Sequence, residues 1–381
     1  MVNIYYKVVN EKVMRNCIFH IPYKISKNGT GARMVRPRKM IQAFRDIGYD
    51  VFVIEGCSEE RQIQIRSLEQ QIRSGWKFEF MYSESSTMPT ILTDPDHLPR
   101  HPFMDFSFFK YIQSCGIPIG LFYADIYWKF ADYGARLPWW KRSAALLCYQ
   151  YDLREYDKYL SKFYGPNIRI LQYLENDKLS AIYSNLLPGA DNLKCPMKCY
   201  ANRNFEKEPL QIFYVGGLGN QYQIAELVKA VASLQECELV LCCRKTEWEK
   251  TEPALKANMS SRIHVVHKSG DELEPLYKKA DICSLMFEKS EYRNMAIPFK
   301  TFEYLAHEKP ILATEETAGG ELVRRLGIGW SITNSEEAIR TAIEGILSSP
   351  SQLTEKQMAS RLAKKENLWT TRARQVARDL A

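Results

Sequence analysis

The sequence lacks the features that define several classes of protein. It has no run of about 20 uninterrupted apolar residues, so we expect no membrane-spanning helix. It has neither low-complexity tracts nor repeats of solenoid length, and its 45% hydrophobic and 25% charged residues are typical of a globular protein. Near the N-terminus, Glu11, Lys12 and Arg15 interrupt any apolar segment that could serve as a secretory signal. We therefore expect a globular, cytoplasmic protein.

Cysteine pairs at metal-binding spacing are also missing. The chain has 10 cysteines, but three residues separate Cys195 from Cys199, Cys242 and Cys243 are adjacent, and neither pair has a second pair at zinc-finger spacing. A chain this long also does not need a disulfide framework. We expect reduced thiols.

The length and the charge of the chain limit the number of domains and the kinds of partner. The 381 residues predict two domains. The net charge is +7, and it is uneven: residues 1–190 contain 25 basic and 19 acidic residues, whereas residues 191–381 contain 27 and 26. A basic first half is compatible with a phosphate-bearing partner or an anionic membrane, and equally with solubility alone.

In the first half, a strand, a glycine-containing loop, a helix and a second strand follow one another, which is the pattern of a parallel crossover unit. Further apolar runs predict two more buried strands and a long helix. The expected strands are 17–21, 51–54, 78–82 and 117–123, and the expected helices are 34–47 and 139–163.

The second half alternates strands and helices regularly, which predicts a parallel sheet covered on both faces. The expected strands are 211–215, 238–242, 263–266, 282–286 and 310–313, and the expected helices are 223–234, 247–257, 271–279, 300–306, 320–326 and 354–381. A proline, a glycine and polar residues over 185–210 predict a domain boundary. Two such domains would meet across a cleft between the carboxyl ends of their strands.

The segment that follows the expected strand 282–286 contains the strongest site signal. Lys300, Glu303 and His307 fall on one face of an expected helix. A lysine at a helix start favours a phosphate group, and a carboxylate one turn later can accept hydrogen bonds from vicinal ribose hydroxyls. On these residues alone, an ordinary surface Lys–Glu pair is an alternative interpretation.

The sequence around this pair resembles a known signature. Residues 298–306 read Pro-Phe-Lys-Thr-Phe-Glu-Tyr-Leu-Ala, and residues 309–314 read Lys-Pro-Ile-Leu-Ala-Thr. Together with residues 214–218, they resemble the nucleotide-sugar signature of GT-B glycosyltransferases, particularly those of glycosyltransferase family 4. The resemblance covers about residues 205–345. It implies an α/β fold with two doubly wound Rossmann-like domains that face a cleft: an acceptor-binding domain (1–187), a nucleotide-sugar-binding domain (188–355), and a C-terminal helix (356–381) that packs back toward the first domain.

The resemblance also implies an activity. A hexosyltransferase of this kind moves a hexose from a UDP- or GDP-linked sugar to a glycan or a lipid-linked saccharide, with retention of configuration and without a metal ion or other cofactor. Such enzymes serve the biosynthesis of capsule and other surface polysaccharides. The donor would be bound by Glu303 at the ribose, by Lys300 at the diphosphate and by Phe299, Gly216 and Gly217 nearby. Lys300 would also stabilise the leaving group.

Two departures from the family pattern affect the donor site. Family 4 members often have a glutamate eight positions before the ribose-binding one, where this chain has Met295, and Glu291 is out of register. The loop after residue 215 also lacks the basic residues that many relatives direct at the pyrophosphate. Arg244 and Lys245, directly after an expected strand, are the candidate substitutes, and a solvated strand end is the alternative.

The first glycine loop is the candidate for binding the acceptor or a phosphate. Gly29, Thr30 and Gly31 precede Arg33 and Arg36, which are about one helical turn apart. With Arg38 and Lys39, these arginines would form a helix face of four cations that could clamp a phosphate or a lipid-linked acceptor. A solvated helix face would have the same pattern. A dinucleotide fingerprint would need a third glycine at the position of Met34, so we do not expect an NAD site.

Two further residues are candidates for the reaction itself. Asp125 follows an expected strand and could orient the acceptor hydroxyl or accept its proton, and His97 could bind hydroxyl groups of donor or acceptor. A purely structural histidine is the alternative for His97. The only Asp-x-Asp sequence, Asp94 to Asp96, lies in the wrong domain to clamp a donor-bound metal ion.

Aromatic and basic residues cluster over residues 128–142, which suits either a membrane headgroup layer or an ordinary core with a charged rim. We therefore consider peripheral contact with the inner face of the plasma membrane, and no nucleic-acid partner, because no nucleic-acid-binding module accompanies the cluster. Two other functions remain open: a catalytically silent GT-B protein that binds a nucleotide sugar or stabilises a partner, and a sugar-nucleotide epimerase.

Overall fold

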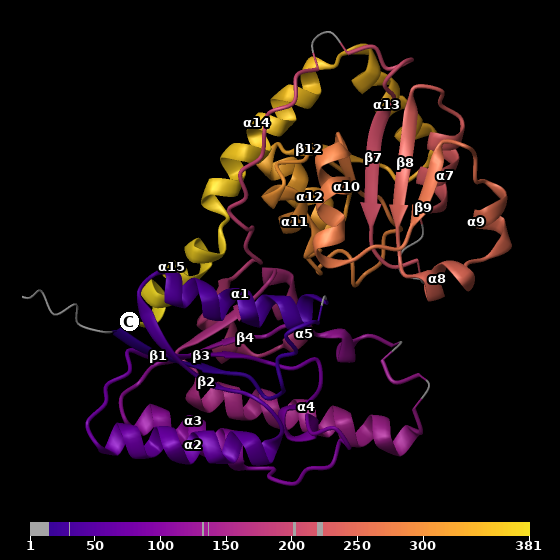
Figure 1. The fold of residues 1–381 in the computed structure, drawn as a ribbon. Helices are drawn as coiled ribbons and strands as arrows, with labels where there is room; N and C mark the ends of the chain where they lie inside the picture. The colour runs from indigo at the N-terminus through magenta and orange to yellow at the C-terminus, as the bar shows by residue number, and fades with distance from the viewer. Residues whose placement is uncertain (1–14, 30, 132, 136, 201–202, 219–223) are drawn as a thin grey trace, which may run out of the picture.

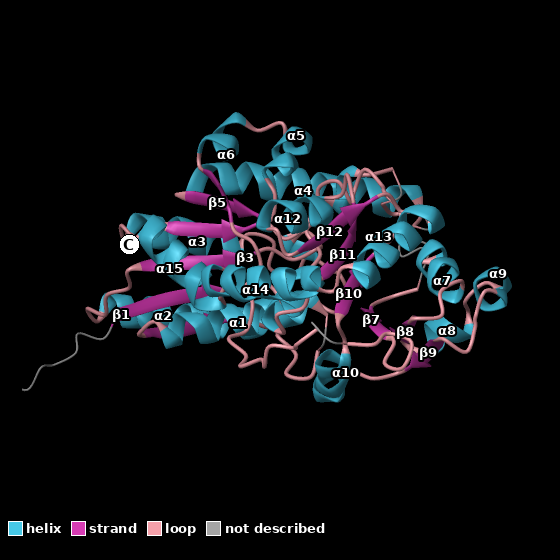
Figure 2. Cartoon of the chain, turned by 90° about the horizontal axis from the view of Figure 1, so that it is seen from above, coloured by secondary structure: helices cyan, strands magenta, loops and turns pink. Residues whose placement is uncertain are grey.

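Two six-stranded parallel sheets, one in each half of the chain, form the framework of the protein (Figure 1). The computed structural model describes residues 15–29, 31–131, 133–135, 137–200, 203–218 and 224–381. The strands of the two sheets form separate groups when the molecule is viewed from above (Figure 2). The expected α/β class with two doubly wound parallel sheets is confirmed.

The N-terminal sheet has the strand order β2-β1-β3-β4-β5-β6. Its strands are β1 (Arg15–His20), β2 (Tyr49–Ile54), β3 (Phe80–Glu84), β4 (Ile119–Phe122), β5 (Lys162–Gly165) and β6 (Tyr183–Asn185). Side chains alternate between its faces: Phe19 packs beneath α1 and α15, and Ile18 packs on the face that α2, α3 and α4 cover. Because both faces are covered, the strands are apolar on both sides.

The helices of the N-terminal half lie on both faces of this sheet (Figure 1). The longer ones are α1 (Ala32–Asp46), α2 (Ser58–Arg73), α3 (Met104–Ser114) and α4 (Trp139–Tyr159), and two short ones are α5 (Leu171–Leu174) and α6 (Asp177–Ala181). Residues 186–209 then lead to the second sheet and, where they are described, form no helix or strand apart from a single bridge between Ala190 and Leu368.

The C-terminal sheet has the strand order β12-β11-β10-β7-β8-β9. Its strands are β7 (Leu210–Val215), β8 (Cys237–Cys242), β9 (Ile263–Val266), β10 (Ile282–Leu285), β11 (Ile311–Thr314) and β12 (Gly329–Ile332). One face packs against α7 (Ala225–Ala232) and α13 (Glu336–Ser348). The other packs against α10 (Glu274–Lys279), α11 (Lys300–Ala306) and α12 (Ala318–Leu326).

The last two helices connect the domains. Helix α14 (Ser351–Glu366) runs from the C-terminal domain toward the first sheet, and α15 (Trp369–Leu380) packs beside α1 (Figure 1). The chain passes so close to the start of α15 that a Cβ atom on Gly189 would lie 2.6 Å from the backbone of Trp369. A glycine at position 189 therefore permits this crossing.

Three expected helices differ from the structure. The C-terminal helix expected over 354–381 is two helices, of which α14 packs against α11 and α12, and only α15 packs on the N-terminal domain. The helix expected over 139–163 ends at Tyr159, because Leu160 is extended and residues 162–165 pair with β4 and β6 as strand β5. The helix expected over 247–257 is two short helices, α8 (Lys245–Glu249) and α9 (Pro253–Ala257). Pro253 begins the second one, since proline suits the first turn of a helix and not its interior.

Candidate active site

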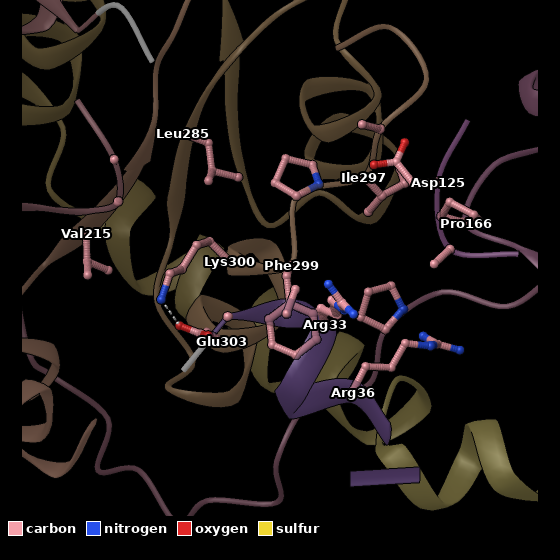
Figure 3. A pocket seen from close by; sticks show the side chains of 18 of the residues that line it. Arg33, Arg36, Asp125, Pro166, Val215, Leu285, Ile297, Phe299, Lys300 and Glu303 are labelled. Carbon is pink, nitrogen blue, oxygen red and sulfur yellow. Dashed lines mark hydrogen bonds and ion pairs between the residues drawn. The ribbon is translucent and has the colours of Figure 1, made fainter. Parts of the chain in front are cut away.

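A cleft of about 900 Å³ lies between the two domains, at the carboxyl ends of both sets of strands. Each sheet therefore contributes the residues that follow its strands, which is where open α/β sheets form their sites. Figure 3 shows that the labelled charged side chains come from both domains: Lys300 and Glu303 from one side, and Arg33, Arg36 and Asp125 from the other.

Lys300 and Glu303 both face this cleft from the first turn of α11 (Figure 3). Their side chains are 32% and 28% exposed, and Lys300 Nζ forms an ion pair with Glu303 Oε2. The Tyr277 hydroxyl donates a second hydrogen bond to the same oxygen at 3.2 Å. The pair is therefore half-buried and oriented by a neighbouring tyrosine, and it does not point to bulk solvent on the outer surface.

The other predicted donor residues also line the cleft. Gly216 and Gly217 follow β7, and Arg244 and Lys245 follow β8 with exposed side chains. Arg244 Nη1 lies 2.9 Å from Glu247 Oε1. Phe299 lies between Lys300 and Arg33 in Figure 3.

Sequence reasoning missed Lys268, a further cation of the same wall. Lys268 lies two residues after β9, just as Arg244 lies two residues after β8. Its position at the carboxyl end of a predicted strand is the signal that could have identified it.

The segment between β10 and α11 crosses to the other domain. Met295, at the position where family 4 members often have a glutamate, lines the cleft but is 3% exposed and packs into the hydrophobic core of the N-terminal domain. Glu291 accepts a hydrogen bond from the Tyr173 hydroxyl at 3.1 Å, and the backbone oxygen of Asn294 accepts one from Arg169 at 2.7 Å. This segment therefore joins the two domains.

Only part of the predicted glycine loop lines the cleft. Gly31 and Arg33 line the cleft at the start of α1, whereas Gly29 does not, and Thr30 lies outside the described residues. Arg38 folds back to donate a hydrogen bond to the Gly29 oxygen at 2.6 Å. The four-cation helix face that the sequence predicts is thus reduced to two residues at the cleft, Arg33 and Arg36.

Arg36 belongs to a buried polar cluster in the wall of the cleft. Its Nε donates to Glu84 Oε1 at 3.2 Å and its Nη2 donates to the Tyr82 hydroxyl at 3.2 Å, while its guanidinium lies 3.5 Å from the centre of the Phe122 ring. Burial raises the pKa of Glu84, and the charge of Arg36 opposes that rise. Glu84 ends β3 and also lines the cleft.

Asp125 lies on the cleft wall just beyond β4. One carboxylate oxygen accepts from the Tyr127 amide at 2.9 Å, and the other accepts from the Tyr292 hydroxyl of the second domain at 3.2 Å. Burial raises the pKa of Asp125, and these hydrogen bonds oppose the rise. Asp125 therefore lines the cleft and also contacts the opposite domain.

His97 lies elsewhere. It is exposed, it does not line the cleft, and its Nδ1 lies 3.1 Å from the backbone oxygen of Leu92. Its backbone has a left-handed φ of 59°. We therefore assign His97 no part in the reaction.

The Asp-x-Asp sequence before His97 has a structural explanation. Asp94 is buried, and its carboxylate accepts hydrogen bonds from the amide and hydroxyl of Ser58 at 2.6 Å each. Asp96 pairs with Arg100. Within the described ranges, no group of three or more His, Cys, Asp or Glu side chains is placed to hold a metal ion.

The aromatic cluster divides into two parts. Trp128 is buried and stacks on Tyr149 with the ring centres 4.7 Å apart. Trp139 and Trp140 are 79% and 55% exposed at the start of α4, with Lys141 beside Trp140. No helix in the described part of the chain is long and apolar enough to cross a membrane.

The chain was compared with known proteins by sequence and by fold. Residues 209–349, which include the whole C-terminal sheet, match the family model described as Glycosyl transferases group 1. This match confirms the expected resemblance over about residues 205–345. A comparison with curated protein sequences gave no significant match.

Three solved structures illustrate the likeness of the fold. Sucrose-phosphate synthase from Thermosynechococcus elongatus is 14% identical with a TM-score of 0.65, and the match covers 96% of this chain and 98% of that one. HepE from Anabaena in complex with UDP and glucose is 12% identical with a TM-score of 0.61, covering 96% and 99%. A glycosyltransferase from Rickettsia africae is 13% identical with a TM-score of 0.62, covering 97% and 99%. The family match and the fold together confirm the prediction of a GT-B glycosyltransferase.

Proposed function

We propose that this glycosyltransferase moves a hexose from a nucleoside diphosphate sugar to a saccharide or lipid-linked acceptor, with retention of configuration, in surface polysaccharide or glycoconjugate biosynthesis. The observation that carries the proposal is the position of Lys300 and Glu303 in a cleft that both domains share. Lys300 would neutralise a diphosphate, and Glu303 would accept hydrogen bonds from the vicinal hydroxyls of the ribose. The complex of Anabaena HepE with UDP and glucose favours a uridine nucleotide, with guanosine as the alternative.

The main electrostatic requirement of the reaction is to stabilise the negative charge of the leaving group. As the bond between the sugar and the diphosphate breaks, negative charge grows on the phosphate oxygens, and fixed cations aimed at them lower the barrier. Lys300, Arg244, Lys245 and Lys268 supply four cations along this wall. We propose that they do so without a metal ion or other cofactor.

The acceptor would lie against the N-terminal domain. Asp125 would orient an acceptor hydroxyl there, since its carboxylate lines the cleft beyond β4. Contacts that already join the domains, such as the ion pair between Arg169 and Glu321 at 2.8 Å, would hold the cleft closed around the reacting groups. A closed cleft excludes water and so favours transfer over hydrolysis.

The donor site is tested by replacing Glu303 with glutamine. Glu303→Gln removes the charge that receives the ribose hydroxyls, so the Kd for UDP should rise about tenfold or more while the melting temperature changes little. Titration calorimetry with UDP and GDP measures the effect. Glu337→Gln is the matched control, because Glu337 is exposed on α13 and does not line the cleft. Unchanged affinity in Glu303→Gln would remove the central assignment.

A panel of nucleotide sugars separates this function from its alternatives. Release of UDP or GDP supports the transferase, and binding without turnover supports the silent GT-B protein. A donor whose sugar is changed without any acceptor supports an epimerase. A protein that binds neither nucleotide contradicts all three.

We also propose that the protein works in the cytoplasm at the inner face of the plasma membrane. Trp139 and Trp140 form an exposed aromatic pair beside Lys141, and such a mixture suits an anionic headgroup layer. Replacing both tryptophans with serine should reduce sedimentation with vesicles that contain anionic lipid. Trp76→Ser is the control, since Trp76 is 51% exposed and lies outside this pair. Equal sedimentation of both variants would contradict the membrane contact.

A further inference from the structure

One nitrogen of Arg36 is left without a hydrogen-bond partner. Arg36 is 6% exposed and lines the cleft, and its Nε and Nη2 are satisfied by Glu84 and Tyr82. Its Nη1 is buried and has no partner among the described residues. A buried donor that is left unpaired costs stability, so natural structures rarely retain one unless a ligand or water completes it.

The surroundings of this nitrogen are rich in positive charge. Arg33 also lines the cleft, its guanidinium lies 4.2 Å from the centre of the Tyr23 ring, and it has no carboxylate partner within the described residues. Behind the wall, burial and the neighbouring charge of Arg36 lower the pKa of Arg372 to about 10. Glu84 is the only carboxylate that forms an ion pair with any of these three arginines in the described structure.

Helix α1 adds to the positive electrostatic potential of this wall. It has 15 residues, its N-cap residue Gly31 lines the cleft, and no acidic side chain lies in its first turn. The N-terminus of such a helix favours an anion. The unpaired Nη1 of Arg36 is an independent indication, because it comes from a buried side chain and not from the backbone of the helix end.

These cations are separate from those of the donor wall. In Figure 3, Arg33 and Arg36 lie on one side of Phe299, and Lys300 and Glu303 lie on the other. Arg33 and Arg36 come from α1 of the N-terminal domain, whereas Lys300, Arg244 and Lys268 come from the C-terminal domain. A diphosphate held by the second group leaves the first group free for another anion.

We propose that the acceptor carries an anionic group, a phosphate ester or a carboxylate, which is bound by Nη1 of Arg36 and the guanidinium of Arg33. The proposal rests on the glycosyl transfer proposed above and narrows the class of its acceptor. Phosphate and carboxylate oxygens accept two guanidinium hydrogen bonds in parallel, which a single hydroxyl cannot do. The anion also compensates the excess of positive charge in the wall.

Binding of small probes to the UDP-saturated protein tests the proposal. With UDP at saturation, the donor cations are occupied, and glucose 6-phosphate, glucuronate and methyl glucoside are titrated in turn. At least one anionic probe should bind and raise the melting temperature, and methyl glucoside should bind at least about tenfold more weakly, because one charge-assisted hydrogen bond is worth that much. Preference for glucose 6-phosphate identifies a phosphate ester, and preference for glucuronate identifies a carboxylate.

Variants then locate the binding. Arg33→Ala should weaken the anionic probe about tenfold or more while the Kd for UDP stays the same. Arg36→Lys retains the charge but loses the planar donor group, so it should weaken the probe as well. Lys27→Ala is the control, since Lys27 is exposed and does not line the cleft.

Three results would overturn the proposal: no anionic probe binds, methyl glucoside binds as tightly, or Arg33→Ala binds the anion like the unmodified protein. Arg33 is exposed, so this last result is informative even if Arg36→Lys does not fold. Failure of the donor assignment would be visible separately, as absence of UDP binding. The anionic probes can then be titrated without nucleotide.

Discussion

The two walls of the cleft hold their charged groups in different ways. On the C-terminal wall, Lys300 and Glu303 are partly exposed and pair with each other within one helix turn. On the N-terminal wall, Arg36 and Glu84 are almost fully buried and come from a helix and a strand 48 residues apart. The first wall can therefore adapt its charges to a ligand, whereas the second holds its charges fixed before any ligand arrives.

This difference separates binding from reaction. Partly exposed cations can be neutralised by a charged ligand at little cost to the fold, since surface ion pairs contribute little to stability. Buried groups are fixed by their surroundings, and such preorganisation is what catalysis and acceptor selection require. We therefore expect variants of the C-terminal wall to affect donor affinity and variants of the N-terminal wall to affect transfer and stability.

The largest effect is expected for Asp125. Asp125→Asn removes the carboxylate that would orient or deprotonate the acceptor, so the transfer rate should fall about 10²–10⁴-fold, the usual contribution of a general acid–base group. The Kd for UDP should stay the same, because Asp125 belongs to the other wall. Rates of UDP release with acceptor, beside UDP titrations, measure both. Equal losses in transfer and UDP binding would show that Asp125 serves the structure of the domain interface.

The next largest effect is expected on the free energy of unfolding, when a charged residue of the N-terminal wall is replaced. Arg36→Met leaves Glu84 buried without its ion-pair partner, so the free energy of unfolding should fall by about 3–5 kcal/mol. Lys300→Met breaks a partly exposed pair and should cost less than about 1 kcal/mol, although it should weaken UDP binding. Denaturant unfolding of the two variants compares the walls directly. Similar losses of stability in both variants would contradict the contrast between them.

The same contrast explains how much of the site the sequence predicts. Three residues of the donor wall, Gly216, Arg244 and Lys268, lie within two residues of a strand end, and the alternation of apolar and helical segments locates those strands in the second half. Lys300 and Glu303 are three residues apart, so their common face follows from helix periodicity. The partners of Arg36 are 46 and 48 residues away, and only the order of strands in the sheet brings them together.

The fold shows a similar division. The helix over 300–306 and the strand over 263–266 have the expected bounds, because local patterns define them. Strand β5 was hidden at the end of a long helical pattern, since pairing with β4 and β6 outweighs local helix preference after Tyr159. Arg38 looked like a ligand-binding cation, and only the folded loop shows that its guanidinium binds backbone oxygens instead.

Two titratable groups, one in each domain, contribute to stability with opposite signs as the pH changes. Asp152 on α4 is 3% exposed and accepts a hydrogen bond from the Thr90 amide at 2.7 Å, and burial raises its pKa to about 7. In the C-terminal domain, burial and nearby lysines lower the pKa of His307 to about 4. The folded state therefore holds an extra proton on Asp152 between about pH 4 and 7, whereas the unfolded state holds an extra proton on His307 between about pH 4 and 6.5.

An effect smaller than that of Arg36→Met follows from these signs. As pH rises from 5 to 8, ionisation of Asp152 should cost the folded state about 2–3 kcal/mol, because a raised carboxyl pKa stabilises the fold only at lower pH. His307 acts in the opposite direction, since its neutral form is favoured in the folded state. Asp152→Asn removes the first contribution and leaves the second, so the variant should gain stability relative to the unmodified protein over this range. Unfolding in denaturant at pH 5 and pH 8 measures how the free energy of unfolding of each protein changes with pH.

This slope against pH is decisive, and the free energy of unfolding at one pH is not. The reason is that the asparagine amide also places new donors beside the buried Asp152 Oδ1 position, which has no partner in the described structure. Equal slopes for the two proteins would mean that Asp152 is ionised throughout, and that the burial of this carboxyl does not oppose the response of His307.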